Sequence, residues 1–331
     1  MRVFDAAATR EALPFERLIP ALRQAFAAGC VAPQRHVHEI STPNGERVTS
    51  LIMPAWIEGR YYGVKVINIA PGNAARGLPA LHASYVLFDA TTGAPLTLVD
   101  GNEITTCRTA ATSALAASWL ATSGPQHLVI VGSGRIARLL YDAYRVVRPI
   151  ARVTIWARSA EQAEGLAAEL RGRGAPAVAS HDLESAVRAA DIVSCATLAS
   201  EPLVRGEWLR AGTHLDLIGS FTPAMREADD ACLAGAVLYV DDLEALRKSG
   251  DLIRPLQRGV FAASDVRGTL ALLAQGLAPG RRSHEERTVF KAVGVALEDL
   301  TAAMLVHEGA GSRFEDAERS PASAERTPRE G

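Results

Sequence analysis

A glycine-rich turn follows a short apolar segment near the middle of the chain. Leu128–Val131 is an unbroken apolar run, which is typical of a strand buried on both faces of a parallel sheet. It continues into Gly132-Ser133-Gly134-Arg135-Ile136-Ala137, a G-x-G-x-x-A sequence, and then into a helix-compatible segment. The first glycine permits a tight turn, the second lets the backbone approach a pyrophosphate, and the helix N-terminus offers free N–H groups. We therefore predict a dinucleotide-binding turn, with an ordinary glycine-rich β–α turn as the alternative.

The next predicted strand indicates which dinucleotide is bound. The acidic residue that holds an NAD ribose normally lies about 20 residues beyond the glycines, at the end of this strand. Val153–Trp156 is β-like, but it ends in Ala157-Arg158-Ser159 without an acid. The guanidinium of Arg158 can pair with the 2′-phosphate of NADP, and Ser159 can add a hydroxyl. The alternative is a solvated arginine at a strand end. The sequence thus predicts that NADPH is preferred and that NADH is possible.

Charged side chains before the glycine turn are candidates for holding a substrate. Lys65 interrupts an apolar strand-like segment, and burying an unpaired ammonium is costly, so it is paired or functional unless that strand face is solvated. Arg108 stands at the start of an Ala-rich helix, where it either forks onto a carboxylate or lies in solvent. Arg35 is a weaker candidate. His82 is a candidate proton donor, although a single histidine is more often a packed polar residue.

Composition narrows the class of protein. A chain of 331 residues, 48% of them hydrophobic, is long enough for two domains with sizeable cores. Its net charge of -2 suggests neither nucleic acid nor an acidic membrane surface as a partner. The four cysteines lack metal-type spacing, so we expect reduced thiols and no metal site. Without a signal-peptide core or a membrane-spanning apolar run, a soluble cytoplasmic protein is expected.

The elements before the glycine turn predict an α+β domain with an antiparallel or mixed sheet. Helix-like spacing between Asp5 and Gly29 is followed by β-rich segments bounded by turn residues. The predicted strands and the helix that ends this domain are Val48–Met53, Tyr61–Ile69, Ala83–Phe88 and the Ala-rich segment Thr105–Ser123.

From Gln126 to about Gly280, strands and helices alternate, which predicts a Rossmann-type, doubly wound parallel sheet with helices on both faces. The predicted strands are Leu128–Val131, Val153–Trp156, Ile192–Cys195, His214–Ile218 and Val237–Val240; the helices include Glu161–Arg171 and Leu183–Ala189. A last helix, Arg287–Leu305, is expected to return to the first domain. The predicted organisation is therefore a first, α+β domain (1–123 and 285–308), a nucleotide-binding domain (124–284), and a disordered polar tail (309–331).

Several stretches in fixed order resemble the ornithine cyclodeaminase/mu-crystallin family over nearly the whole chain to about Leu305. They are LIMPAW (51–56), YYGVKVINIAPGN (61–73), GLPALHASYVLFDATTGAPL (77–96), EITTCRTAATSALAA (103–117), VIVGSGRIA (129–137), GSFTPAMREADD (219–230) and VFKAVGVALEDL (289–300). The resemblance implies a homodimer whose first domain forms the interface and the substrate site, while the second is a Rossmann unit.

The resemblance also implies roles for individual residues. Arg35, Lys65 and Arg108 match positions that face a substrate carboxylate, with the lysine near the reacting carbon. The residues expected to line the cofactor, including those of the glycine turn, are Thr109, Gly132, Ser133, Gly134, Arg135, Ile136, Ala157, Arg158, Ser159, Thr197, Leu198 and Ile218.

Two departures from the family pattern bear on the reaction. Cyclodeaminases carry an aspartate where this chain has Phe221, and an acidic residue where Leu51 precedes Ile52-Met53-Pro54. A diamine substrate would therefore find neither carboxylate, and cyclodeaminase activity is disfavoured. The GSFTPAMREADD loop is similar to that of members that reduce cyclic ketimine acids.

The hypothesis that follows is NAD(P)H-dependent reduction of Δ1-pyrroline-2-carboxylate or Δ1-piperideine-2-carboxylate to L-proline or L-pipecolate. Arg35 and Arg108 would hold the carboxylate, while Lys65 or His82 would manage the imine proton. The alternatives are an ornithine cyclodeaminase, an alanine dehydrogenase, a hydroxyproline dehydratase, or a non-catalytic mu-crystallin-like protein that binds NADPH and an aromatic ligand. Retention of Lys65 and both arginines argues against binding alone.

Overall fold

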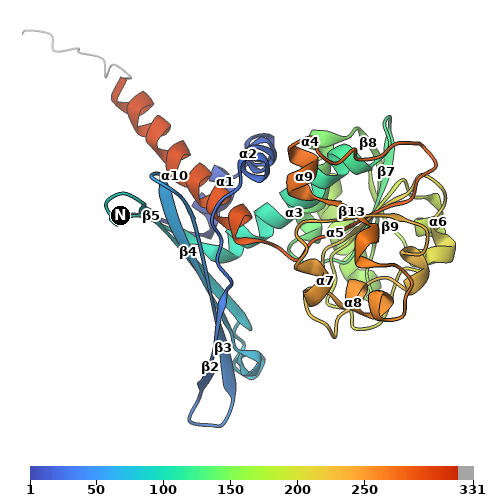
Figure 1. Cartoon of the computed structure of the whole chain (residues 1–331), viewed down its shortest axis with the longest axis horizontal. Coiled ribbons are helices and arrows are strands. Elements are labelled where there is room, and N and C mark those ends of the chain that lie inside the picture. Colours follow the sequence, from blue (N-terminus) through green and yellow to red (C-terminus); the bar gives the residue numbers. More distant parts are fainter. Residues whose placement is uncertain (320–331) are drawn as a thin grey trace, which may run out of the picture.

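The structure is a computed structural model, and residues 1–319 of the chain are described. Two β-sheets lie on either side of the long helix α3 (Gly101–Leu120), as Figure 1 shows. Asp100 caps this helix by accepting a hydrogen bond from the N–H of Glu103, and most of its residues are buried. Because a helix that is apolar on all sides must be buried, α3 serves as the shared core element between the two sheets.

The first sheet has six strands in the order β1-β6-β5-β4-β3-β2. Strand β1 pairs parallel with β6, and the other pairs are antiparallel, so the predicted mixed sheet is confirmed. The bounds are β1 (Arg2–Phe4), β2 (His36–Ser41), β3 (Arg47–Ile57), β4 (Tyr61–Ile69), β5 (Leu81–Asp89) and β6 (Pro95–Asp100). Strands β1, β2 and β6 were not predicted; every residue of β2 is exposed, so it carries no apolar alternation to read.

One face of this sheet packs against helices α1 (Ala6–Ala12), α2 (Phe15–Ala28), α3 and α10 (Ala296–Arg319) to form the first core. Leu18, Leu22 and Phe26 recur at helical spacing on α2 and are buried there. Strand alternation turns every second residue of β4 towards these helices, and Lys65 is one of them. A lysine therefore lies in the core between the sheet and its helices.

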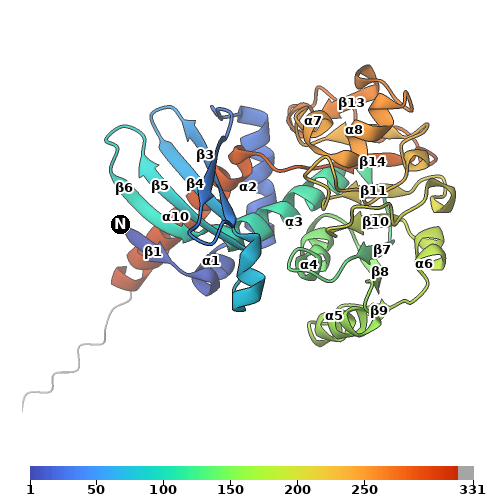
Figure 2. The same cartoon turned by 90° about the horizontal axis from the view of Figure 1, so that it is seen from below.

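The second sheet consists of eight parallel strands in the order β13-β12-β14-β11-β10-β7-β8-β9, with β7 and β10 near its middle (Figure 2). From β7 the chain first builds β8 and β9 on one side and then β10 and β11 on the other. The bounds are β7 (Gln126–Val131), β8 (Ile150–Trp156), β9 (Ala177–Ala179), β10 (Ile192–Cys195), β11 (His214–Leu217), β12 (Val237–Val240), β13 (Val266–Thr269) and β14 (Thr288–Lys291). Strand order thus reverses at β7, which makes its carboxyl end the crevice where such sheets bind ligands.

Helices connect these strands as the alternating pattern predicted. They are α4 (Ala137–Val147), α5 (Ala160–Gly172), α6 (Leu183–Ala189), α7 (Ala245–Lys248), α8 (Gly250–Gln257) and α9 (Leu270–Ala274). The Rossmann-type fold class is confirmed. Among the described residues, no helix has the length and apolar character needed to cross a membrane.

The helix predicted over Arg287–Leu305 is wrong in its first part. Thr288–Lys291 forms β14, which pairs with both β11 and β12 in the second sheet, and α10 begins only at Ala296. A short apolar run suits a buried strand and a buried helix equally well, so periodicity could not separate them. The chain therefore returns to the first sheet after Lys291, later than the predicted boundary at 285.

The segment from 309, predicted to be disordered, is helical as far as Arg319; residues 320–331 lie outside the described part.

Candidate functional site

A cavity of about 580 Å³ opens where β7, β8 and β10 reach their carboxyl ends. This is the point where the strand order reverses. Seven of the predicted cofactor residues line it: Gly132, Ser133, Gly134, Ala157, Arg158, Thr197 and Leu198.

The glycine turn has the geometry that the sequence predicted. Gly132 has a φ of 127°, and a Cβ there would lie 2.6 Å from the carbonyl oxygen of Ala196. A Cβ on Gly134 would meet nothing within 4 Å, so the backbone at this residue is open to the cavity. Ala137 begins α4 and is fully buried against the sheet. A tight turn, an open backbone and a helix N-terminus together fit the pyrophosphate of a dinucleotide.

Arg158 follows β8 at the edge of this cavity and is exposed. It makes no ion pair with any carboxylate of the described residues, so its guanidinium is available to an anionic group. The hydroxyl of Ser159 instead caps α5, accepting a hydrogen bond from the N–H of Gln162 at 3.3 Å. Arg158 and Ser159 were both predicted to contact the 2′-phosphate of NADP, but only Arg158 lines the cavity.

The remaining predicted cofactor residues do not line the cavity in this structure. Arg135 is exposed and Ile136 half-buried in the turn before α4. Thr109 is buried on α3, where its hydroxyl donates to the carbonyl of Thr105 at 2.6 Å. Ile218 is buried directly after β11.

Lys65 and Arg108 meet at two acidic residues of α10. The Nζ of Lys65 lies 2.5 Å from Oδ2 of Asp299, and Nε of Arg108 lies 3.2 Å from Oδ1 of the same carboxylate. Nη1 of Arg108 donates to Oε2 of Glu298 at 2.6 Å. All four side chains are at most 9% exposed. The structure therefore brings together two predicted cations from β4 and α3 through a helix some 200 residues away in sequence.

The cluster shifts the pKa values of Lys65 and Arg108 in opposite directions. Burial lowers the pKa of Lys65 to about 8, with Arg108 acting in the same direction and Asp299 opposing it. Burial also acts to lower the pKa of Arg108, but Glu298 and Asp299 outweigh it and raise that pKa above its usual value. Arg108 therefore stays charged at any accessible pH, whereas Lys65 can exchange a proton near neutral pH.

Glu298 and Asp299 were missed as functional residues by the sequence analysis. Their signal is present: two adjacent acids stand inside an apolar helical segment that is quoted among the family stretches. Acids on an apolar helix are buried only where cationic side chains lie opposite them. The sequence of the helix alone does not show whether such side chains are there. Their partners come from β4 and α3, so the pairing was not readable from α10 alone.

Asp241, at the carboxyl end of β12, extends the acidic cluster into the second sheet. Its Oδ2 accepts hydrogen bonds from the N–H groups of Val293 and Gly294 at 2.7 and 2.6 Å. Burial and the nearby Glu298 raise the pKa of Asp241 to about 7. Gly294 has a φ of 78°, and a Cβ there would collide with the guanidinium of Arg108. The segment that joins the two sheets thus packs directly against the guanidinium of Arg108.

Arg35 lines a second cavity, of about 480 Å³, between the two parts of the chain. Met53 faces it from the first sheet, while Asp241 and Gly294 face it from the other side. Burial lowers the pKa of Arg35, followed by the positive charge of Arg108, and Asp299 and Glu244 oppose this. Arg35 therefore experiences the same charge cluster as Lys65 and Arg108.

His82 is not brought to this cluster. It is the second residue of β5 rather than a residue before the strand, and it pairs with Asn68 in register. Lys65 pairs with Tyr85, three residues further along β5, so alternation turns His82 to the opposite face of the sheet from Lys65. His82 is exposed there. Within the described residues, no group of three or more His, Cys, Asp or Glu side chains is arranged to hold a metal ion.

Comparison with known proteins places this architecture in a family. The model of the ornithine cyclodeaminase/mu-crystallin family matches residues 4–313, and the chain belongs to this family. It is similar to the Δ1-pyrroline-2-carboxylate reductase of Paracoccus denitrificans, with 43% identity over 298 residues that cover 89% of this chain and 92% of the relative. It is also similar to the ketimine reductase mu-crystallin of Rattus norvegicus, with 34% identity covering 88% and 91%.

Solved structures agree with these relationships. The Δ1-pyrroline-2-carboxylate reductase of Thermococcus litoralis, in complex with NADH and L-proline, matches with a TM-score of 0.88 and 31% identity, covering 95% of this chain and 98% of that one. An archaeal alanine dehydrogenase, described as a dimer with bound NAD, matches with a TM-score of 0.87 and 29% identity over 95% of this chain. The predicted family membership is confirmed.

We expect Gly132→Ala to weaken dinucleotide binding by at least about tenfold, because a Cβ would require the turn to move away from Ala196 and strain a backbone of positive φ. Titration of the variant with NADPH and NADH, followed by nicotinamide fluorescence, measures this. Gly172→Ala is the matched control, since a Cβ there meets nothing within 4 Å. Equal affinities in the Gly132→Ala variant and the wild type would contradict the assignment of this turn.

Proposed function

We propose that this protein reduces cyclic ketimine acids, Δ1-pyrroline-2-carboxylate and/or Δ1-piperideine-2-carboxylate, to L-proline and L-pipecolate with NADPH or NADH. The observation that carries the proposal is the buried cluster that Lys65 and Arg108 form with Glu298 and Asp299 of α10, beside a cavity that Arg35 lines. Relatives that are named Δ1-pyrroline-2-carboxylate reductases support the choice of substrate.

The charges of the cluster suit a small monocarboxylic acid. Arg35, Lys65 and Arg108 contribute three positive charges, and Glu298 and Asp299 contribute two negative ones when ionised. While Asp241, whose pKa is raised to about 7, is protonated, one positive charge is left for the single carboxylate of an imino acid. Arg108, held in place by two carboxylates, and Arg35, at the cavity wall, would bind that carboxylate.

Lys65 would supply the proton that the reaction requires. Bound NAD(P)H supplies a hydride to the imine carbon, and the C=N bond becomes a C–N single bond when its nitrogen takes up a proton. Lys65, with a pKa of about 8, is mostly protonated at neutral pH and yet far more acidic than a solvated lysine, which suits a general acid. The ion pair with Asp299 holds its ammonium in one place. His82 has no part in this proposal, because its strand position turns it to the other face of the sheet.

The cofactor would lie along the carboxyl ends of β7, β8 and β10. The glycine turn would hold the pyrophosphate, and Thr197 and Leu198 would line the cavity on the β10 side. Preference for NADPH over NADH is part of the proposal and depends on the exposed guanidinium of Arg158, which has no carboxylate partner among the residues that the structure describes.

We also infer that the protein acts as a homodimer. The face of the first sheet opposite the helices presents Trp56, Tyr62 and Phe88, which are only half-buried. The rings of Tyr62 and Phe88 stack at 5.4 Å, and those of Trp56 and Tyr62 meet edge-on at 6.4 Å. Apolar aromatic surface of this kind is typical of subunit interfaces.

In this proposal the first sheet with its helices is the substrate and dimerisation domain, and the second sheet is the cofactor domain. The cytoplasmic location expected from the sequence stays a prediction.

The proposed activity is tested by mixing the purified protein with Δ1-pyrroline-2-carboxylate or Δ1-piperideine-2-carboxylate and either NADPH or NADH. We expect the nicotinamide absorbance to fall with at least one ring size. Parallel reactions with pyruvate plus ammonia, ornithine and cis-3-hydroxyproline test the alternative reactions of the same fold. No cofactor oxidation with either cyclic imine would reject the proposal, and oxidation with pyruvate and ammonia alone would favour an alanine dehydrogenase.

Lys65→Ala should abolish turnover while leaving cofactor affinity nearly intact. In the wild type, the protonated fraction of Lys65 decreases as the pH rises through about 8, so kcat/KM should decrease over the same range. Asp299→Asn removes the charge that raises this pKa, so the decrease should move to lower pH. Glu308→Gln, on the same helix but on the exposed surface, should keep the wild-type profile. A wild-type kcat/KM that stays constant between pH 7 and 10 would show that Lys65 is not the proton donor.

Arg158→Asp should shift the ratio of kcat/KM for NADPH over NADH towards NADH by about tenfold or more, because a charge-assisted contact is replaced by repulsion of the 2′-phosphate. Steady-state kinetics with both cofactors measure the ratio. Arg152→Asp is the control, since Arg152 is exposed on the same strand but does not line the cavity. If Arg158→Asp changed neither cofactor's kcat/KM, the assignment of Arg158 to the 2′-phosphate would be wrong.

A further inference from the structure

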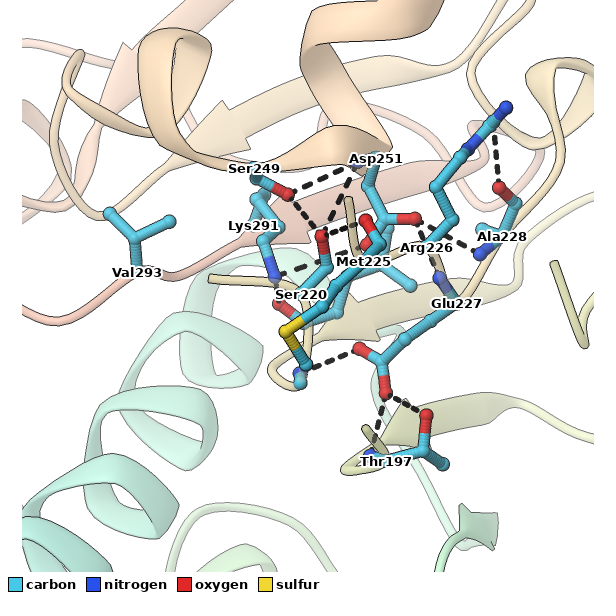
Figure 3. Close-up of polar contacts among 12 residues, drawn as sticks. Thr197, Ser220, Met225, Arg226, Glu227, Ala228, Ser249, Asp251, Lys291 and Val293 are labelled. Atoms are coloured by element: carbon cyan, nitrogen blue, oxygen red, sulfur yellow. Dashed lines mark hydrogen bonds and ion pairs between the residues drawn. The ribbon is translucent and has the colours of Figure 1, made fainter. Parts of the chain in front are cut away.

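A fully buried carboxylate joins two strand ends beside the cofactor cavity. Oε1 of Glu227 accepts hydrogen bonds from the N–H of Thr197 at 2.7 Å and from its hydroxyl at 2.8 Å (Figure 3). Oε2 of Glu227 accepts from the N–H of Gly219 at 2.6 Å. Thr197 follows β10 and Gly219 follows β11, so one side chain links the turns after two neighbouring parallel strands.

These two turns lie on one side of the glycine turn. Arg158, which follows β8, marks the other side, where the adenosine half of a dinucleotide binds. The nicotinamide half therefore extends over the ends of β10 and β11, where Thr197 lines the cavity. Neither the proposed substrate cluster nor the glycine motif includes Glu227.

The turns are packed without room for adjustment. A Cβ on Gly219 would collide with the carbonyl oxygen of Thr197 and would also meet Oε1 of Glu227. A shift of Thr197 is therefore transmitted to the turn after β11. The carboxylate of Glu227 decides where Thr197 lies, because it binds both the backbone and the side chain of that residue.

The backbone of Glu227 is itself fixed by hydrogen bonds to a second buried carboxylate, that of Asp251. Oδ1 of Asp251 accepts from the N–H groups of Glu227 at 2.8 Å and Ala228 at 3.1 Å. Nζ of Lys291 donates to the carbonyl of Leu217 at 2.9 Å and lies 4.0 Å from Oδ2 of Asp251 (Figure 3). Burial acts to raise the pKa of Glu227, while Lys291 and the hydrogen bonds from Thr197 act in the opposite direction and favour the carboxylate. Such a network stabilises one arrangement of the loop only while every donor keeps its acceptor.

We propose that Glu227 is a positioning residue for the nicotinamide half of the cofactor, acting through Thr197 and Gly219. The proposal rests on the proposed function in one respect, namely that the cavity binds NAD(P)H. Glu227 touches neither cofactor nor substrate in this account. Its effect is to set the spacing between the ends of β10 and β11, and with it the position of the reacting ring.

The test compares two nucleotides in Glu227→Gln. The amide nitrogen of Gln would face an N–H donor where an oxygen now accepts, so one of the two turns must move. We expect the Kd for NADH to rise by about tenfold, while the Kd for ADP, which has adenosine and pyrophosphate but no nicotinamide, changes by less than about twofold. With the cyclic imine as substrate, kcat should fall and the KM for the imine should stay nearly constant, because Lys65 and Arg108 are untouched.

Two further variants make the result decisive. Glu227→Asp keeps the charge but is one methylene too short to reach both turns, so it should act in the same direction if Glu227→Gln does not fold. Asp216→Asn is the matched control, because Asp216 is a fully buried carboxylate of the same sheet that accepts from Ser194 and Tyr144 within the core. It should lower the thermal stability without changing the ratio of the NADH and ADP affinities.

The outcomes separate this inference from the proposed function. An NADH affinity within about twofold of wild type in folded Glu227→Gln or Glu227→Asp would overturn the positioning role, as would a parallel loss of NADH and ADP binding, which indicates a merely structural role. A wild-type protein that binds neither nucleotide would overturn the proposed function first and this inference with it. Because the binding measurements need no imino acid, a protein that binds NADH but reduces no ketimine would still decide the role of Glu227.

Discussion

The pairing of Lys65 and Arg108 with the two acids of α10 is the interaction on which the candidate site depends. A buried cation without a partner costs several kcal/mol, so β4 and α3 can bury these side chains only when Glu298 and Asp299 lie opposite them. The four side chains therefore connect the first sheet, the central helix and the last helix of the chain. Removal of Asp299 would leave Lys65 buried without the carboxylate that it contacts, whereas Arg108 would keep its contact with Glu298.

The same pairing places the proposed substrate site at the junction of the two sheets. Asp241, from the end of β12, lies close to Glu298 and holds the backbone of Val293 and Gly294. This segment leaves the second sheet after β14 and leads directly into α10. The covalent connection between the two parts of the chain thus passes through the charge cluster, which gives the cluster a fixed position relative to the cofactor cavity.

Parallel strands impose the second constraint. All eight strands of the second sheet are parallel, so their carboxyl ends lie along one edge. Residues that follow different strands, and are far apart in sequence, therefore lie close together there. Glycine at 132 and 219 allows three turns to pack directly on one another, and Glu227 supplies the acceptors that their N–H groups need. A cationic substrate cluster on one side and closely packed turns on the other suit the reduction of a small imino acid, since that reaction requires chiefly that a substrate and a reduced nicotinamide be held in register.

The sequence by itself indicated the glycine turn and the parallel sheet. It also singled out Lys65 and Arg108 as candidate site residues. Each has a local signature: glycines between an apolar run and a helix, alternation of strands and helices, and a lysine within an apolar strand. It also indicated the family, because motifs spread over the chain occur in a fixed order.

Only the tertiary structure decided which of these residues lie together. It paired Lys65 with Asp299, turned His82 to the far face of its sheet, and made Thr288–Lys291 a central strand rather than the start of a helix. It also revealed Glu227, whose partners belong to two other turns. The physical reason is the same in each case: a buried polar group is defined by partners that are distant in sequence, and a short apolar run takes its conformation from the neighbours that cover it.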